Sequence, residues 1–153
     1  MLNSGDNAPD FEGIDDTGNK VTLYGLMKDR PIILYFYPKD ETPGCTTEAC
    51  TFRDNWDEFA SRGVQVIGVS SDSVETHRKF KEHRKLPFTL ISDEGSKIRK
   101  LYQATGFLIP PRISYVIGPD KKIVASYNSQ MNPKEHVNKA IESIKGLEKI
   151  EKN

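Results

Sequence analysis

The sequence predicts an α/β fold with a mainly parallel central sheet, and three observations support this prediction. Two continuous apolar runs, residues 31–37 and 64–70, are typical of strands buried on both faces of a parallel sheet. Stretches with an amphipathic helical pattern lie between the apolar runs. A turn sequence at residues 118–121 separates two further apolar segments, which indicates a β-hairpin beside the parallel strands.

The remaining elements follow in the order expected of such a fold. Further strands are expected at residues 88–91, 113–117 and 123–127. Helices are expected at residues 46–61, from residue 73 onward, at residues 95–103 and at residues 133–146. Asp72 is the expected cap of the second helix, and Asn132 is that of the last, with Pro133 at its first position. The charged residues after Gly146 are expected to fray.

A small N-terminal hairpin is expected around Phe11 and residues 21–24. Together these elements form a central mixed sheet flanked by helices, with an N-terminal β extension. This arrangement is thioredoxin-like in outline, although the pattern alone also fits other small α/β folds. We expect one domain over residues 1–153, because the chain has no repeat, no low-complexity stretch and no Gly/Ser linker.

Composition and charge exclude several classes of function. Lys and Arg total 22, as do Asp and Glu, so the zero net charge gives no reason to expect nucleic acid or an anionic membrane as a partner. No apolar run approaches the roughly 20 residues that span a bilayer. The N-terminus lacks the basic start and apolar segment of a secretory signal. We therefore expect a cytoplasmic location, where neighbouring cysteines are usually catalytic or metal-binding.

Cys45 and Cys50 are the only cysteines, and they are the leading candidates for chemistry. Cys45 falls in the first turn of an expected helix, where free N–H groups and the helix dipole favour a thiolate. A thiolate can attack a peroxide oxygen to give a sulfenic acid, which condenses with a second thiol to a disulfide. In an unbroken helix the two Cα atoms would lie about 8–9 Å apart, whereas a disulfide tolerates about 7 Å. The helix must therefore unwind before the bond forms.

The residues alone leave two other interpretations of this cysteine pair open. A zinc site is disfavoured, because zinc usually takes four ligands and His77, His83 and His136 are expected on solvent-facing helices. We accordingly expect no metal and no cofactor. The second alternative is a pair of inert buried thiols.

The segment around Cys45 resembles the active-site motif of the peroxiredoxins. Residues 38–45 match the pattern Pro-x-x-x-Thr-x-x-Cys, and the longer run 36–54 is similar to the bacterioferritin comigratory protein, or peroxiredoxin Q, subfamily. The similarity extends over nearly the whole chain, from residues 5–11 to residues 112–117.

The resemblance implies a role for each matching residue. Cys45 would be the peroxidatic nucleophile, and Cys50 would be the resolving thiol of an intramolecular disulfide. Thr42 would place its hydroxyl on the peroxide, and Arg112 would stabilise the thiolate and hold the peroxide oxygens. Pro38 would shield the thiolate from water.

Glu48 completes the implied site, since it lies one helical turn after the peroxidatic cysteine and would orient an arginine. The resemblance further implies a thioredoxin-like fold. It implies an enzyme that reduces hydrogen peroxide and organic hydroperoxides and is recycled by thioredoxin or another dithiol protein. We expect a monomer or a weak dimer.

Purely structural roles for these residues and other functions for the protein remain as alternatives to this interpretation. Thr42 can serve simply as a helix N-cap, and Arg112 as a surface ion-pairing residue. A thiol–disulfide oxidoreductase acting on proteins is one alternative, although its usual pair is Cys-x-x-Cys, and four residues separate the pair here. A redox sensor or holdase is another, although no exposed apolar surface is evident.

Overall fold

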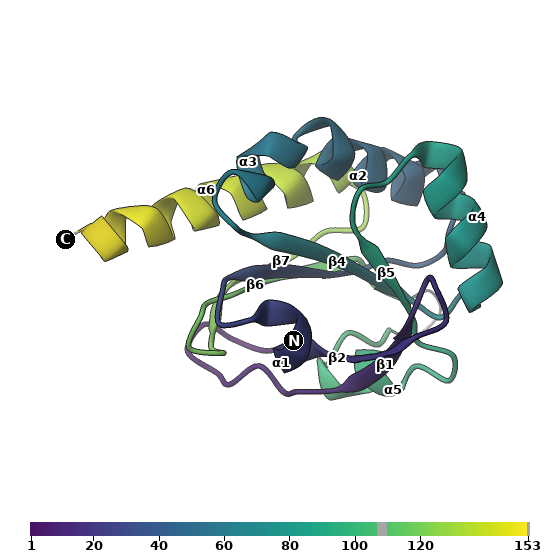
Figure 1. Ribbon diagram of the computed structural model, residues 1–153, viewed down its shortest axis with the longest axis horizontal. Helices are drawn as coiled ribbons and strands as arrows, with labels where there is room; N and C mark the ends of the chain where they lie inside the picture. Colours follow the sequence, from purple (N-terminus) through teal and green to yellow (C-terminus); the bar gives the residue numbers. More distant parts are fainter. Residues whose placement is uncertain (107–109, 153) are drawn as a thin grey trace.

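A seven-stranded mixed sheet forms the centre of the structure, with helices on both of its faces (Figure 1). The computed structural model describes residues 1–106 and 110–152, with residues 149–152 described by their backbone only. The strand order is β2-β1-β5-β4-β3-β6-β7. The strands are β1 (Glu12–Asp15), β2 (Lys20–Thr22), β3 (Ile32–Phe36), β4 (Gln65–Ser70), β5 (Thr89–Ser92), β6 (Ile113–Ile117) and β7 (Ile123–Asn128).

The middle of the sheet is parallel, as the two long apolar runs predict. β3 pairs in parallel with β4, and β4 with β5. β6 and β7 form an antiparallel hairpin whose first strand lies antiparallel to β3. The N-terminal hairpin β1–β2 adds antiparallel strands at the other side, through β5. The predicted mixed sheet with an N-terminal β extension is confirmed.

The helices cover the sheet in two layers. They are α1 (Leu23–Met27), α2 (Pro43–Asp54), α3 (Trp56–Ala60), α4 (Val74–Arg84), α5 (Lys97–Leu101) and α6 (Pro133–Lys152). α2, α3, α4 and α6 lie over one face, and α1 and α5 lie over the other (Figure 1). α2 begins at the carboxyl end of β3, which places its N-terminus at the sheet edge where ligand sites gather in open α/β folds.

β3 anchors the segment that leads to the site, and it is fully buried on both faces. Its alternate side chains, such as Leu34 and Phe36, enter the core under α1 and α5. Ile33 and Tyr35 enter the core under α2 and α6. Each such side chain contributes about 1.5–3 kcal/mol through burial, so the segment that leaves Phe36 starts from a firmly held point.

The structure corrects several predicted element boundaries. The predicted helix 46–61 is two helices with a break at Asn55, whose amide donates to the Thr51 carbonyl at 2.9 Å and competes with the helix. Ser73 caps α4 by accepting from the Thr76 backbone, in place of Asp72. α6 continues to Lys152 rather than ending near residue 146.

The short helix α1 was not predicted. Thr22 begins it, because its hydroxyl accepts from the Gly25 backbone N–H.

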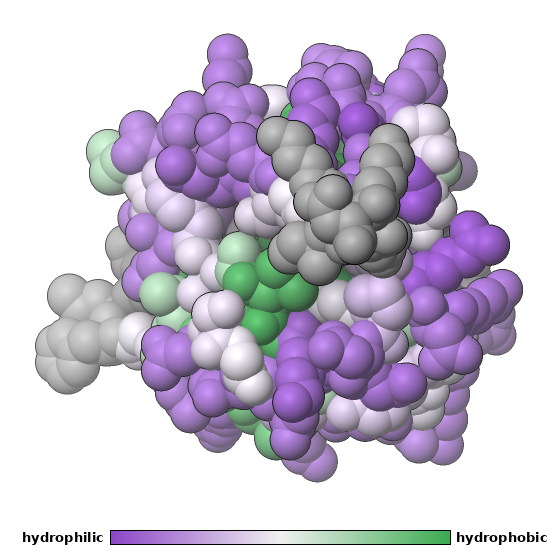
Figure 2. Space-filling view, turned by 90° about the vertical axis from the view of Figure 1, so that its left-hand side faces the viewer, coloured by the Kyte–Doolittle hydropathy of each residue, from purple (hydrophilic) through white to green (hydrophobic). Residues whose placement is uncertain are grey.

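The end of the molecule remote from the start of α2 carries a mostly hydrophilic surface with one small apolar area (Figure 2). Pro31, Val64, Ile144 and Leu147 line a pocket where the N-terminal end of β3 meets α6. Within the described residues, no helix combines the length and apolar character that crossing a bilayer requires.

Candidate active site

Cys45 is the third residue of α2 and lies just beyond the carboxyl end of β3. Its side chain is only 2% exposed, and the thiol is free. Pro43 occupies the first turn, where a missing N–H costs nothing, and Thr46 N–H already bonds the Thr42 carbonyl at 2.8 Å. The unpaired N–H groups of this turn therefore surround Cys45 and favour a negative charge on its sulfur.

A shallow pocket opens next to this turn. Its wall is formed by residues from three segments of the chain, namely Pro38, Thr42, Pro43, Gly44, Thr47, Arg112, Gln130, Met131 and Pro133. The structure thus brings Pro38, Thr42 and Arg112 together beside Cys45. The Thr42 hydroxyl donates to the Lys39 carbonyl at 2.8 Å and makes no cap bond to the helix, so the N-cap role of this side chain is not realised.

Arg112 is the cation of the site, and it is not a surface residue because it is only 4% exposed. Its Nη1 donates to Glu48 Oε1 at 2.7 Å, and its Nε donates to the Gln130 carbonyl at 3.4 Å. Burial disfavours the positive charge of Arg112, but the interactions with Glu48 and Cys45 outweigh burial. The pKa of Arg112 is therefore raised. Gly44 permits this approach, since a Cβ there would lie 2.9 Å from Arg112 Nη2.

Glu48 is fully buried below Arg112. Burial raises the pKa of Glu48 to about 8, although the charge and hydrogen bond of Arg112 act against the rise. In the part of the chain that the structure describes, its Oε2 has no hydrogen-bond partner, and it lies 3.6 Å from His136 Nδ1. A carboxyl group in this position carries a proton over much of the neutral range.

His136 is buried, and so is His77, which corrects the prediction that all three histidines face solvent. Only His83 is exposed. His136 Nε2 donates to the Ser129 carbonyl at 2.7 Å, so Nδ1 accepts from the Ser114 hydroxyl at 2.6 Å. Burial lowers the pKa of His136 to about 4, which keeps the ring neutral. The helical spacing concealed this arrangement, because the partners come from β6 and the loop before α6.

Cys50 lies five positions after Cys45 in the same unbroken helix α2, and it is half-buried with a free thiol. It does not line the pocket. The two Cα atoms of residues five apart in a helix lie about 8–9 Å from each other, which is beyond the reach of a disulfide. The structure therefore describes the dithiol form.

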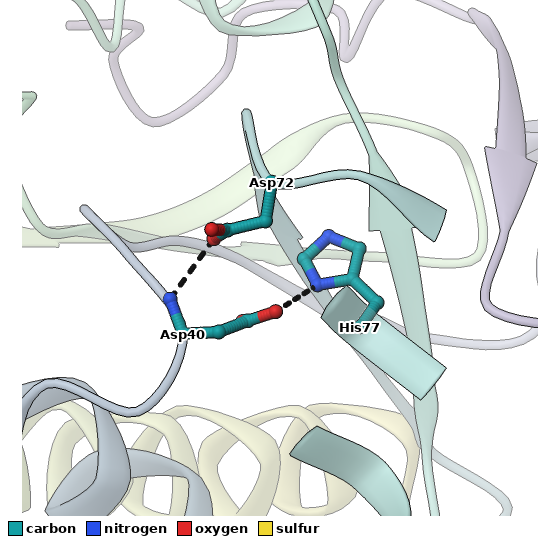
Figure 3. A group of neighbouring side chains, drawn as sticks. All are labelled: Asp40, Asp72 and His77. Carbon is teal, nitrogen blue, oxygen red and sulfur yellow. Dashed lines mark hydrogen bonds and ion pairs between the residues drawn. The ribbon is translucent and has the colours of Figure 1, made fainter. Parts of the chain in front are cut away.

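A second buried cluster, which the sequence did not reveal, anchors the loop between β3 and α2 (Figure 3). His77 on α4 directs Nδ1 to Asp40 Oδ2 at 2.6 Å and Nε2 to the Ile91 carbonyl at 3.0 Å. Because both ring nitrogens face acceptors, the ring is an imidazolium. Burial alone would lower its pKa, but Asp40 outweighs burial, and the pKa of His77 is raised. Asp72 accepts from the Asp40 backbone at 2.9 Å.

The ligand atoms of Asp40, Asp72 and His77 lie within 4.8 Å of one another, which is the spacing of a small metal site. However, the Asp40 carboxylate also accepts from Tyr37 Oη at 2.5 Å, and Asp72 Oδ2 also accepts from Ser70 Oγ at 2.5 Å. These atoms are thus already engaged within the protein. The cluster is a hydrogen-bonded ion pair that fixes the approach to α2.

Asp40→Asn is expected to destabilise the fold by about 3 kcal/mol near pH 6, because it leaves a buried imidazolium without its anion. The pKa of His77 is raised in the folded state, so the His77–Asp40 pair contributes its full stabilisation below the unfolded pKa of about 6.5. Its contribution is lost as pH rises through the folded pKa. Urea unfolding near pH 6 and near pH 9 measures the difference, which should shrink at the higher pH.

Glu41→Gln is the matched control, because Glu41 pairs with His83 at 2.6 Å on the exposed surface of the same loop. Its effect should stay within about 0.5 kcal/mol at both pH values. An Asp40→Asn penalty that grows with pH would contradict the assignment of His77 as the cation.

Known proteins resemble this chain along most of its length. A model described as the AhpC/TSA family matches residues 4–126. Chloroplastic peroxiredoxin Q of Arabidopsis thaliana is 42% identical over 147 residues, which cover 94% of this chain and 68% of that protein. The crystal structure of peroxidoxin BcpB from Mycobacterium tuberculosis has a TM-score of 0.90 at 35% identity and covers 95% of this chain and 98% of its own.

A third similarity concerns the bacterioferritin comigratory protein of Xanthomonas campestris, whose structure is described for its alkyl peroxide reduction activity. It has a TM-score of 0.79 at 26% identity and covers 87% of this chain and 90% of its own. The family model spans both the loop that leads into α2 and the strand β6 that follows Arg112. The chain therefore belongs to the peroxiredoxins, in the peroxiredoxin Q or bacterioferritin comigratory protein group, and it is a peroxidase.

Proposed function

We propose that Cys45 is the peroxidatic thiol of this peroxidase and that Cys50 resolves it. The observation that carries the proposal is the geometry around Cys45, which lies in the first turn of α2 beside an arginine held by Glu48. The Cys45 thiolate attacks the terminal oxygen of a peroxide ROOH, the O–O bond breaks, and the sulfur becomes a sulfenic acid. The departing RO⁻ takes a proton to give an alcohol, or water when the substrate is hydrogen peroxide.

Arg112 and Thr42 are the groups that we propose act on the peroxide. Both line the pocket next to Cys45. The guanidinium is held by Glu48 and the Gln130 carbonyl, and its Nη2 lies beside Gly44 in the pocket wall, where it can stabilise charge on the departing oxygen. Pro38 covers the same wall and excludes water.

Resolution requires α2 to unwind, and the helix carries features that help it do so. Thr47 Oγ1 donates to the Pro43 carbonyl at 2.9 Å, and Thr51 Oγ1 donates to the Thr47 carbonyl at 2.6 Å. Such bonds compete with the backbone ladder and weaken a helix. Once the first turns open, the Cys50 thiol attacks the Cys45 sulfenic acid, water leaves, and a disulfide forms. A dithiol protein such as thioredoxin then reduces the disulfide.

Peroxide turnover with a thioredoxin system, followed by mass spectrometry of the protein, tests this cycle. We expect a Cys45–Cys50 disulfide after one equivalent of peroxide. Cys50→Ser should consume one equivalent and then stop as a sulfenic acid. Thr51→Ser, which changes the next residue without removing a thiol, should turn over like the wild type. Multiple turnovers by Cys50→Ser with thioredoxin would exclude Cys50 as the required resolving thiol.

Protein disulfide reduction is the competing function. The buried position of Cys45 opposes it, because a protein disulfide must contact the attacking sulfur directly. Insulin reduction as fast as peroxide reduction would favour that alternative.

The pocket beside Cys45 suits small organic hydroperoxides as well as hydrogen peroxide, since Pro43, Met131 and Pro133 provide apolar contacts. The Xanthomonas campestris relative is described for alkyl peroxide reduction. We also propose a cytoplasmic location, because Cys45 and Cys50 must be returned to thiols after each turnover, which needs a reducing compartment. The plant relative is named as chloroplastic, and cell fractionation distinguishes the two compartments.

Glu48→Gln is expected to keep the peroxide rate within about threefold near pH 7, because a carboxyl with a pKa of about 8 is mostly protonated there. Glutamine keeps an oxygen that accepts from Arg112. As pH rises through 8, the wild-type carboxyl gains a negative charge close to the thiolate, whereas the variant stays neutral. The rate of the wild type relative to Glu48→Gln should therefore fall above about pH 8.

Stopped-flow rates with hydrogen peroxide from about pH 6 to pH 9.5 measure this ratio. Glu48→Ala is the comparison variant, because it removes the acceptor as well as the charge and should lose about tenfold at every pH. A Glu48→Gln rate as low as that of Glu48→Ala near pH 7 would contradict a protonated Glu48.

A further inference from the structure

Arg99 on α5 is a buried arginine that the peroxide mechanism above does not use. Its side chain is only 2% exposed, on the face of the sheet opposite α2. Every hydrogen bond that its guanidinium makes within the described residues goes to a backbone carbonyl. The oxygens of Tyr37, Ala104 and Pro111 accept at 2.6, 2.9 and 2.9 Å, and Nε has no partner among the described residues.

Two of these carbonyls belong to the segments that build the active site. Tyr37 is the residue directly before Pro38, and Pro111 is the residue directly before Arg112. The two segments are 74 positions apart in the sequence (111 − 37 = 74). The planar guanidinium of Arg99 hydrogen-bonds to the carbonyl oxygens of both segments at once. It thereby fixes the distance between the loop that leads to Cys45 and the strand that presents Arg112.

Among the residues that the structure describes, no carboxylate is in direct contact with the Arg99 guanidinium to balance its charge. Asp93 is the nearby anion, but its oxygens accept from the backbone N–H groups of Ile98 and Arg99 at 2.9 and 3.0 Å. The guanidinium instead lies 5.6 Å from the centroid of the Phe36 ring. A buried cation without a contacting anion is costly.

The anion that this charge can serve is the Cys45 thiolate. Burial lowers the pKa of Arg99, and the charges of Asp93 and Cys45 act in the opposite direction. Arg112 acts on Cys45 from the pocket side, so the sulfur lies in the field of two buried cations that approach from different elements.

We propose that Arg99 is a positioning residue for peroxide reduction, which ties the Pro38 and Arg112 segments together and adds a second positive charge for the Cys45 thiolate. The inference rests on the proposed role of Cys45. Since Arg99 lines no part of the substrate pocket, it acts through the backbone and through its field rather than by touching the peroxide.

The test uses Cys50→Ser as the parent protein, so that Cys45 is the only thiol. Arg99→Met, Arg99→Lys and the control Arg62→Met are added to it; Arg62 also bonds a backbone carbonyl, that of Glu58 at 2.7 Å, away from the site. Two quantities are measured for each protein. One is the pH midpoint of Cys45 alkylation by iodoacetamide, and the other is the rate of the single reaction with hydrogen peroxide.

Arg99→Met should raise the alkylation midpoint and lower the peroxide rate by about tenfold to a hundredfold. Arg99→Lys keeps the charge but cannot form the fork, so its midpoint should stay within about 0.3 of the parent while its rate still falls. Arg62→Met should change neither quantity.

Parent-like midpoint and rate in Arg99→Met would overturn the proposal. If Arg99→Met does not fold, Arg99→Lys decides, because a parent-like rate in that variant would remove the positioning role. Failure of the proposed function is distinguishable, since the parent itself would then not react with peroxide while the alkylation midpoints would still report on Arg99.

Discussion

Cys45→Ser is expected to reduce peroxide turnover by at least about 10⁴-fold, down to the uncatalysed background. A serine hydroxyl fits the same space in the first turn of α2, but it does not ionise in the neutral range, so the attacking anion is lost. The surrounding pocket, including Arg112 and Glu48, stays in place because the substitution is nearly isosteric. Stopped-flow consumption of hydrogen peroxide with thioredoxin as reductant measures the loss.

The comparison variant is Cys50→Ser, which lies in the same helix and removes the other thiol. It should react with the first equivalent of peroxide at the wild-type rate and fail only in later turnovers. This contrast separates attack from resolution. Equal loss of the first reaction in both variants would contradict the assignment of Cys45 as attacker, and turnover by Cys45→Ser would contradict it directly.

The sequence predicted the parts of this site that depend on local chain order. An apolar strand followed by Pro43, Gly44 and a helix places Cys45 in a first turn, and the structure has this geometry. Helix periodicity likewise predicted that the two cysteines lie too far apart to bond. These inferences succeeded because the interactions involved span only a few residues.

The buried polar groups could not be predicted in the same way. His77 and His136 each lie in a charged or polar helical stretch, and their hydrogen-bond partners belong to β5, β6 or loops outside their own helices. Arg99 has the same property, because its partners are carbonyl oxygens, which every residue carries. Periodicity identifies the apolar face of a helix, but it does not show which polar residue finds partners under that face.

Arg112→Met is expected to lower the rate of the reaction between Cys45 and peroxide by about 10²–10³-fold. The substitution removes the charge that stabilises both the thiolate and the departing oxygen, and it keeps most of the apolar stem. Arg112→Lys should recover part of the loss, since an ammonium supplies charge but cannot bond Glu48 and the peroxide as a planar fork does.

Gly44→Ala perturbs the same guanidinium without touching its charge. A Cβ at this position would lie 2.9 Å from Arg112 Nη2, so the arginine must shift while Glu48 holds its other nitrogen. We expect a rate loss of about tenfold, with α2 still folded. A wild-type rate in Gly44→Ala would show that the exact placement of Nη2 is not required.

The stability of Arg112→Met separates its structural role from its catalytic one. Without the guanidinium, nothing opposes the burial that raises the pKa of Glu48. A carboxyl whose pKa is higher in the folded than in the unfolded state contributes its full stabilisation below the unfolded pKa of about 4.3. That stabilisation is lost as pH rises toward the folded pKa. Arg112→Met should therefore lose more stability near pH 9 than near pH 6.

Adding Glu48→Gln to Arg112→Met should remove this pH dependence, because no buried carboxyl is left to ionise. The double variant should regain stability near pH 9 in urea unfolding, yet its peroxide rate should stay at the level of Arg112→Met. Recovery of both quantities would mean that Arg112 serves only to neutralise Glu48. Recovery of stability alone places the catalytic effect of Arg112 at the thiolate and the peroxide, because its side chain lines the pocket.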